Sequence, residues 1–527
     1  MAGWDHGYVT DIPYIAQFHH HTSPVWVSAI ATLNGAIPPD LTIPFTHADF
    51  GCGHGVTSLL SAAAMPHAEF WGFDFNPAHI RAARDIARRA GLTNIHFEEA
   101  SFEELAKLPA DALPKFDFTV AHGILSWISP ENQRHLYDVI GQRLAPGGIA
   151  YLSYNISPGW AAMPPVRTLM RLLIESNPAR TDEAASAAFD VLGKMKTAGA
   201  ALFQAHPGLE RRLAELRSQN ATYVAHEFLN RDWHPMMFTD VATAMAAVKC
   251  EFAGASAVLE NATAFTVPEK MREMFATIRD VKLRETVRDL LTANSFRRDL
   301  YQRGHMRATG LDGQRRASEI AFARTVQTVT QPLNIQTPLG MQTIGHPAVT
   351  ALLTILVQGP RTIAALRQEA DLTVLGDAGL IEAIMLLMTG GFVMPMYPGA
   401  VTEAAVETSA RLNRVHVELL ATGEDRTYLA TPGLGSAILV RTVDLMAVDA
   451  IRSGAVTDQA SLLDGVVGHL ARLGRDIMQD GKPVTDREVS RRMVADLVKS
   501  FVSDHLPVYR DLGILAIPSW AEAGAGS

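Results

Sequence analysis

Short apolar segments alternate with helical segments through roughly the first 160 residues, and this alternation limits the fold more than any other feature of the chain. Strand patterns occur at 46–49, 69–73, 94–97, 116–121 and 149–155, and helix patterns at 56–64, 79–90 and 132–144. Strands separated by such helices are typical of a parallel sheet with helices on both faces. We therefore expect an α/β, Rossmann-like, doubly wound domain.

The pattern changes after residue 163. Helical periodicity dominates to about residue 324, and the Thr-, Gln- and Pro-rich residues 326–345 predict an irregular connection. Helical segments at 348–358, 362–370 and 379–389 then precede Gly390, Gly391 and a short apolar strand, in a winged-helix-like order. The third of these helices carries apolar residues and Glu382 instead of Arg or Lys. We therefore expect it to pack or to bind a partner, and not to contact DNA.

These changes predict three domains, in line with the size prior for 527 residues. Residues 1–163 would form the doubly wound domain with an N-terminal lid segment, and residues 164–330 a mostly helical middle domain. Residues 346–518 would form a winged-helix-like, mainly α C-terminal domain. Residues 519–527 are small and polar, and we expect a disordered tail.

The composition, with 48% hydrophobic and 19% charged residues, is that of an ordinary globular protein. A net charge of −9 argues against broad nucleic-acid binding and is compatible with a basic acceptor, such as a lysine-bearing protein. We see neither a membrane helix nor a signal peptide. The two cysteines, Cys52 and Cys250, do not form a disulfide framework, so we expect a cytoplasmic location.

A glycine-rich loop follows the first strand and precedes the first helix, with the sequence DFGCGHG from Asp49. Glycines let the backbone turn tightly and let a ligand approach it, and the helix behind offers free N–H groups. Gly51, Cys52 and Gly53 could hold the methionine carboxylate of S-adenosylmethionine, with Asp49 accepting from its ammonium. A structural strand–helix turn uses the same residue types.

Three further positions favour S-adenosylmethionine. Asp74 ends the second strand, where a carboxylate can accept from both ribose hydroxyls; its alternative role is a helix cap. Phe75, Ser101 and Phe102 could contact the adenine. A dinucleotide fingerprint needs G-x-G-x-x-G, whereas this loop has G-x-G-x-G.

Two longer strings support a resemblance to a known family. They are AHGILSW from Ala121 and SYNISPGW from Ser153. With the glycine loop they resemble class I methyltransferases that carry a methyltransferase regulatory domain, a group that includes the rickettsial protein-lysine methyltransferases. YVAHEFL from Tyr223 resembles the start of that regulatory domain. Ser23 departs from the family's T-H-P lead-in. The resemblance covers most of the chain and is weak after about residue 400.

Methyl transfer to lysine needs a desolvated pocket and a route for the proton, so we expect aromatic and polar residues at the strand ends to form the site. The candidates for catalysis are Tyr14, His122, Tyr154 and Asn155, and His122 and Gly123 could also contact the cofactor. The candidates for the acceptor pocket are Trp127, Trp160, Tyr223, His226 and Glu227.

Each of these candidates has a structural alternative. Trp127 and Trp160 suit core anchors, His122 could bond a backbone carbonyl, and His226 and Glu227 could be structural polar residues on a helix. The run His19, His20 and His21 invites a metal interpretation, but consecutive side chains cannot all face one ion from a regular element. We therefore expect no metal.

Three functions remain open. The first is methylation of lysine side chains in a protein substrate by a chain that neither binds nucleic acid nor inserts into a membrane; a homodimer is compatible with the sequence. The second is the same chemistry on a small molecule. The third is a non-catalytic scaffold with a methyltransferase fold, against which the intact Asp49, Gly51, Gly53 and Asp74 argue.

Overall fold

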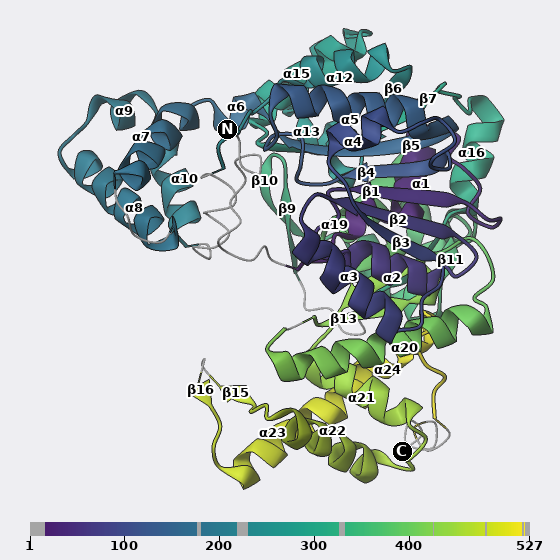
Figure 1. Ribbon diagram of the computed structural model, residues 1–527. Helices are drawn as coiled ribbons and strands as arrows, with labels where there is room; N and C mark the ends of the chain where they lie inside the picture. Colours follow the sequence, from purple (N-terminus) through teal and green to yellow (C-terminus); the bar gives the residue numbers. More distant parts are fainter. Residues whose placement is uncertain are drawn as a thin grey trace.

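The computed structural model describes residues 16–176, 181–218, 230–325, 332–424, 426–479, 482–518 and 521. Its centre is a seven-stranded sheet with the strand order β3-β2-β1-β4-β5-β7-β6 (Figure 1). The strands are β1 (Thr46–Phe50), β2 (Glu69–Asp74), β3 (Ile95–Glu99), β4 (Phe116–Ala121), β5 (Leu144–Asn155), β6 (Cys250–Ala255) and β7 (Phe296–Arg303). Strands β1 to β5 are parallel, and β7 lies antiparallel between β5 and β6.

Helices cover both faces of this sheet, as the alternating pattern predicts. One face packs on α1 (Pro24–Leu33), α2 (Val56–Ala64) and α3 (Pro77–Arg89). The other packs on α4 (Phe102–Lys107), α5 (Pro130–Arg143) and α12 (Phe238–Ala247). Buried aromatic residues such as Phe50, Phe70 and Phe118 fill the two layers, so the doubly wound prediction is confirmed.

The middle of the chain is not helical throughout. Helices α6 (Ser157–Trp160), α7 (Met163–Glu175), α8 (Thr181–Thr197), α9 (Ala201–Ala205) and α10 (Gly208–Arg217) form a lobe beside the sheet (Figure 1, left). Strands β6 and β7 then return to the central sheet, so the sheet does not end at residue 163. Between these two strands the predicted helical character is present in short pieces, which include η3 (Glu269–Met271), α14 (Arg272–Thr277) and α15 (Val281–Thr292).

The predicted connection between the middle and C-terminal parts contains a regular hairpin. Strands β9 (Leu333–Thr337) and β10 (Gly340–Ile344) pair antiparallel, and this corrects the expectation of an irregular segment. Leu333, Ile335 and Thr337 are buried, while Asn334 and Gln336 between them are exposed. This period-2 pattern over five residues was too short to detect among the polar residues around it.

The C-terminal part begins with α17 (Pro347–Ile355), β11 (Arg361–Thr362), α18 (Ile363–Leu366), α19 (Gly376–Thr389) and β12 (Val393–Pro395). Strands β11 and β12 pair with β8 (Ala321–Arg324) in a three-stranded sheet. Half of α19 is buried, from Leu380 to Met388, in agreement with a packing role. Among the described residues, Ala370–Thr389 is long and apolar enough to cross a membrane, and 44% of its most apolar stretch is buried inside the protein.

The last helices form a separate layer with its own core. Helix α20 (Glu403–Leu419) packs on α2 and α3, which cover one face of the large sheet. Helices α21 (Thr442–Arg452), α22 (Gln459–Leu473), α23 (Arg487–Ser500) and α24 (Leu506–Asp511) continue away from it (Figure 1, bottom). The predicted tail 519–527 lies outside the described residues except for Ala521.

Candidate active site

A cavity of about 950 Å³ lies where β1, β2, β3 and β4 end. This is the edge at which parallel α/β sheets bind ligands. Its lining is largely apolar, with a few polar groups at fixed points. The residues around it are Gly51, Gly53, Phe73, Asp74, Phe75, His79, Ala100, Ser101, Phe102, His122, Gly123, Ile124, Trp127, Ile128, Ser129 and Asn132. Most of the residues predicted to contact the cofactor are therefore close together.

The loop between β1 and α2 depends on its glycines. Gly51 and Gly53 have φ of +78° and +54°, in the left-handed region that favours glycine. A Cβ at Gly51 would lie 2.3 Å from Ile124 Cδ1, whereas one at Gly53 would meet no atom within 4 Å. The loop therefore presents bare backbone to the cavity at Gly53, where a ligand can approach it.

Asp74 is fixed at the end of β2 by its neighbours. Its carboxylate accepts from the backbone N–H groups of Gly53 and Asn76, each at 2.9 Å, and lies 3.3 Å from His79 Nδ1. The N-cap of α3 is Asn76, which accepts from the Ala78 N–H at 2.9 Å. The alternative role of Asp74 as the helix cap is therefore wrong: Asp74 connects the glycine loop to β2.

Phe75, Ser101 and Phe102 line the same cavity. Ser101 also caps α4: its hydroxyl accepts from the Glu104 N–H at 3.2 Å and donates to Glu104 Oε2 at 2.8 Å. The Ser101 hydroxyl is thus already engaged in a capping box, which limits what it can offer a ligand.

A second, smaller cavity continues from the first and shares Gly51, Gly53 and His122 with it. Its remaining lining residues are Ala16, Gln17, His19, Thr22, Asp49, Cys52, His54, Val56, Thr57 and Val120. Burial raises the pKa of Asp49 to about 7, and the charge of Asp74 adds to this, although the Ser58 hydroxyl donates to Asp49 at 3.0 Å. A buried carboxyl of this kind would be stabilised by a cation in the cavity. Burial also raises the pKa of the Cys52 thiol, which makes it a poor nucleophile.

His122 lines both cavities. Its Nδ1 lies 2.8 Å from the Tyr151 hydroxyl and 3.2 Å from Ser153 Oγ, and its ring lies 4.0 Å from that of His19. Burial, helped by the nearby charge of Arg298, lowers its pKa well below the usual value, so the ring is neutral. Its partners at Nδ1 are side-chain hydroxyls and not the backbone carbonyl considered from the sequence.

Tyr154 and Asn155 lie elsewhere than expected. The Tyr154 hydroxyl donates to Asp299 at 2.5 Å inside the protein, and neither Tyr154 nor Asn155 lines the two cavities. Successive side chains of a strand point to opposite faces. Tyr154 therefore points away from the face of β5 that carries Tyr151 and Ser153, the two residues that hold His122. The sequence analysis missed both, and counting alternate positions along β5 would have found them.

The two tryptophans behave differently. Trp160 lies in an apolar cluster with Trp233, and its Nε1 donates to the Ser295 carbonyl at 2.7 Å, as a core anchor does. Trp127 belongs to the same cluster and also lines the larger cavity. Trp127 therefore joins the cofactor cavity to the helical lobe.

Four candidates, Tyr14, Tyr223, His226 and Glu227, lie outside the described residues. Within the described part of the chain no group of three His, Cys, Asp or Glu side chains is placed to hold a metal ion. Burial lowers the pKa of His19 and His20 to about 4, and that of His21 falls as well. These histidines are neutral.

Two family models match parts of this chain. A family model described as a methyltransferase domain matches residues 48–148, and one described as a predicted methyltransferase regulatory domain matches residues 220–303. An uncharacterized protein of Synechocystis is 29% identical over 514 residues, which is 97% of this chain and 99% of the relative. A trans-aconitate 2-methyltransferase of Methylobacterium radiotolerans is 33% identical over 138 residues, 26% of this chain and 47% of the relative.

The fold is shared along nearly the whole chain with a solved structure, PKMT2 from Rickettsia typhi in complex with AdoHcy. The identity is 18%, the TM-score 0.70, and the match covers 95% of this chain and 99% of that one. The glycine loop, the acidic strand ends and the two family models all point to one kind of enzyme. The chain is a class I S-adenosylmethionine-dependent methyltransferase that carries a methyltransferase regulatory domain.

Proposed function

We propose that this methyltransferase transfers methyl groups to lysine side chains of a protein substrate. The observation that carries the proposal is the pair of connected cavities, one holding the fixed carboxylate of Asp74 and the other the buried carboxyl of Asp49, which meet at His122. The resemblance of the sequence motifs to protein-lysine methyltransferases supports the lysine acceptor. The similarity of the fold to PKMT2 over 95% of the chain is in keeping with it.

The lining residues fit S-adenosylmethionine. Asp74 would accept from the ribose hydroxyls, and the Phe75 and Phe102 rings would flank the adenine. The open backbone at Gly53 would accommodate the methionine part, and Asp49 would accept from its ammonium, because its raised pKa marks a buried carboxyl that lacks a cation. Ser101 contributes mainly by capping α4.

Bound S-adenosylmethionine supplies an electrophilic methyl group on a positively charged sulfur. The chain aligns the acceptor with it and keeps water out, mainly through Trp127, Ile124 and the neutral imidazole of His122. Tyr151 and Ser153 hold the His122 ring in place. An acceptor amine must be neutral to react, and a site of buried aromatic and neutral groups favours its neutral form.

A small-molecule acceptor is the second candidate. It is favoured by the relative named trans-aconitate 2-methyltransferase, which matches 26% of this chain. That match leaves out most of the chain. The regulatory and C-terminal parts of this chain add surface around the site and fit a large substrate better. The domain limits 1–163, 164–330 and 346–518 remain our proposal for how that surface is divided.

The cofactor site is tested by calorimetric titration with S-adenosylhomocysteine. Removal of charge-assisted hydrogen bonds to two hydroxyls should cost about 2–3 kcal/mol, so Asp74→Ala should bind about 30- to 150-fold more weakly than the unmodified protein. Asp111→Ala, which removes an exposed carboxylate near the end of α4, is the matched control and should bind normally. A well-folded unmodified protein that binds no S-adenosylhomocysteine would contradict the enzyme function and favour the scaffold.

A further inference from the structure

A third cavity, of about 1300 Å³, lies beside the histidine segment, and none of its lining residues lines either of the two cavities described above. It is bounded by the N-terminal segment, by the regulatory domain and by the C-terminal part. Its lining residues are His20, His21, Trp26, Ala257, Val258, Leu259, Glu260, Thr266, Arg288, Asp289, Thr292, Ala293, Asn294, Ser295, Phe296, Arg297, Arg298, Gln336, Thr337, Pro338, Met388 and Thr389. We call it the regulatory cavity.

The histidine segment His19 to His21, together with Phe296, lies between the regulatory cavity and the cofactor cavities, and we call these residues the wall. His19 lines the cavity of Asp49, while the next two residues, His20 and His21, line the regulatory cavity. On the same wall, Phe296 lies edge-on to His122 with ring centroids 6.2 Å apart. Ser256 fixes the wall by donating to the His21 carbonyl at 2.8 Å. The wall therefore consists of the neutral histidine rings and the Phe296 ring. It lies next to His122, where we propose that methyl transfer occurs.

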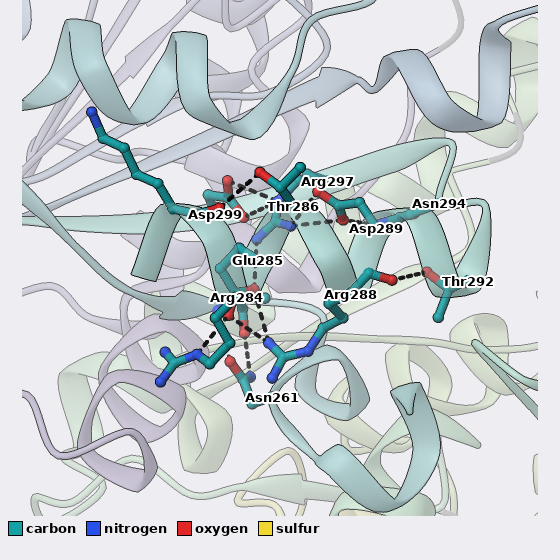
Figure 2. Close-up of polar contacts among 12 residues, drawn as sticks. Asn261, Arg284, Glu285, Thr286, Arg288, Asp289, Thr292, Asn294, Arg297 and Asp299 are labelled. Carbon is teal, nitrogen blue, oxygen red and sulfur yellow. Dashed lines mark hydrogen bonds and ion pairs between the residues drawn. The ribbon is translucent and has the colours of Figure 1, made fainter. Parts of the chain in front are cut away.

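One carboxylate in this cavity lacks a partner. Glu260 Oε2 is shielded from solvent and has no hydrogen-bond partner among the described residues. The charges of two arginines, Arg297 and Arg298, act on Glu260. The Arg297 guanidinium is already paired with Asp289, Asp299 and Glu285 (Figure 2). A buried carboxylate without a counter-ion is costly unless a ligand supplies one.

Arg298, which also lines the regulatory cavity, would favour the neutral form of an amine acceptor. The Arg298 guanidinium lies over the Phe296 ring at 4.9 Å, and its Nε has no partner among the described residues. Burial lowers the pKa of His19, His20 and His122, and the charge of Arg298 lowers it further. The same field would lower the pKa of an ammonium that reaches the wall, and so favour the neutral amine.

We propose that the regulatory cavity is the entrance for the acceptor lysine, and that Glu260 binds its ammonium and takes its proton. This assignment rests on the proposed lysine methylation. The proton passes from the ammonium to the Glu260 carboxylate, which leaves a neutral amine and a neutral carboxylic acid. The amine nitrogen then forms a bond with the methyl carbon, the carbon–sulfur bond breaks, and its electron pair stays on sulfur.

The test uses S-adenosylmethionine with short peptides that each carry one lysine in varied flanking sequence, and matching peptides with arginine in its place. Glu260→Gln should lower kcat/KM for the best lysine peptide about 100-fold. Burial raises the pKa of Glu260 to about 8 against the opposing charges of Arg297 and Arg298, with Asp299 and Asp289 nearby. Wild-type kcat/KM should therefore rise with an inflection near pH 8, and the variant should lack it. His20 and His21, with pKa values of about 4 or lower, stay neutral there.

Glu269→Gln, an exposed change in the same stretch of chain, is the matched control and should keep wild-type kinetics. The affinity of Glu260→Gln for S-adenosylhomocysteine should also match the wild type, because Glu260 lines neither cofactor cavity. If Glu260→Gln does not fold, Gln336→Trp decides instead. Gln336 is an exposed β9 residue on the cavity lining, and a bulky side chain there should raise the KM for the peptide at least tenfold with kcat little changed.

The outcomes separate this assignment from the proposed function. Equal methylation of lysine peptides by wild type and Glu260→Gln would contradict the role of the regulatory cavity as the acceptor entrance. An unchanged KM in Gln336→Trp would contradict it as well. Either result would leave the proposed lysine methylation intact. A wild type that binds S-adenosylhomocysteine but methylates no lysine peptide would overturn both.

Discussion

Strands β1 to β5 and strands β6 and β7 lie in one sheet, but different interactions stabilise the two parts. Apolar side chains fill both faces of the first part, and its loops turn at glycines. In the second part, Arg297 on β7 is fully buried among three carboxylates, those of Glu285, Asp289 and Asp299 (Figure 2). The first part borders the proposed cofactor site, and the second borders the regulatory cavity.

This difference indicates that the two parts of the sheet have different structural roles. An apolar core with glycine turns makes a rigid frame, which suits a cofactor that is the same in every reaction cycle. A buried ion network holds its members in one arrangement, because every charge depends on the others for its partners. It also reaches β5, since Tyr154 donates to Asp299. We expect the two parts to respond separately to mutation.

The largest effect should come from the ion network. Arg297→Met leaves Asp289 and Asp299 buried without their cation, whereas Glu285 keeps its ion pair with Arg288. Removal of the cation from buried carboxylates typically costs about 3–5 kcal/mol. Hydrogen exchange followed by mass spectrometry should show at least about 100-fold faster exchange of the β6 and β7 amides, and little change in β1 to β4. Arg315→Met removes an exposed arginine from a surface ion pair and should leave the exchange pattern unchanged. Equal loss of protection in β1 to β4 would refute the separation of the two parts.

The same contrast explains what could be predicted from the sequence. Strand β4 and helix α2 were predicted at their observed bounds, because their apolar residues follow one clear period. The glycine loop and Asp74 were identified from residue types that chemistry requires there. Strand β7 was missed, because FRRDLYQR has the composition of a solvated segment, and its charges are buried only through partners on α15 that no local pattern shows.

A smaller effect should come from the glycine loop, in the cofactor-binding part. Gly51→Ala combines a left-handed backbone with a Cβ that would lie 2.3 Å from Ile124 Cδ1, so we expect about 2–3 kcal/mol of lost binding free energy for S-adenosylhomocysteine. Gly53→Ala has the backbone cost alone, about 1 kcal/mol, because no atom lies within 4 Å of its Cβ. Titration calorimetry compares the two variants. Wild-type affinity in Gly51→Ala would contradict the steric argument, whereas equal losses would mean that the ligand itself occupies the space at Gly53.

The smallest effect, counted for each pH unit, should be the change of cofactor affinity with pH, which we attribute to Asp49. Its pKa of about 7 means that the free protein holds a proton on Asp49 below that pH. A ligand ammonium favours the ionised carboxylate, so binding releases this proton, and affinity should fall as the pH falls, by up to tenfold for each pH unit. The range of about pH 5.5 to 7 isolates Asp49, because an α-ammonium stays charged there. The neighbouring His19 and His54, with pKa values of about 4, stay neutral.

Titration in two buffers of different ionisation enthalpy would count the released protons directly. Near pH 6 the count should approach one for the wild type and zero for Asp49→Asn, whose affinity should not vary with pH. A wild-type affinity that is constant over this range would mean that Asp49 is already ionised without the cofactor, or that the ammonium binds elsewhere. The two parts of the sheet would then differ less than their structures suggest, because a carboxylate in the cofactor-binding part would be stabilised by protein groups alone, as those around Arg297 are.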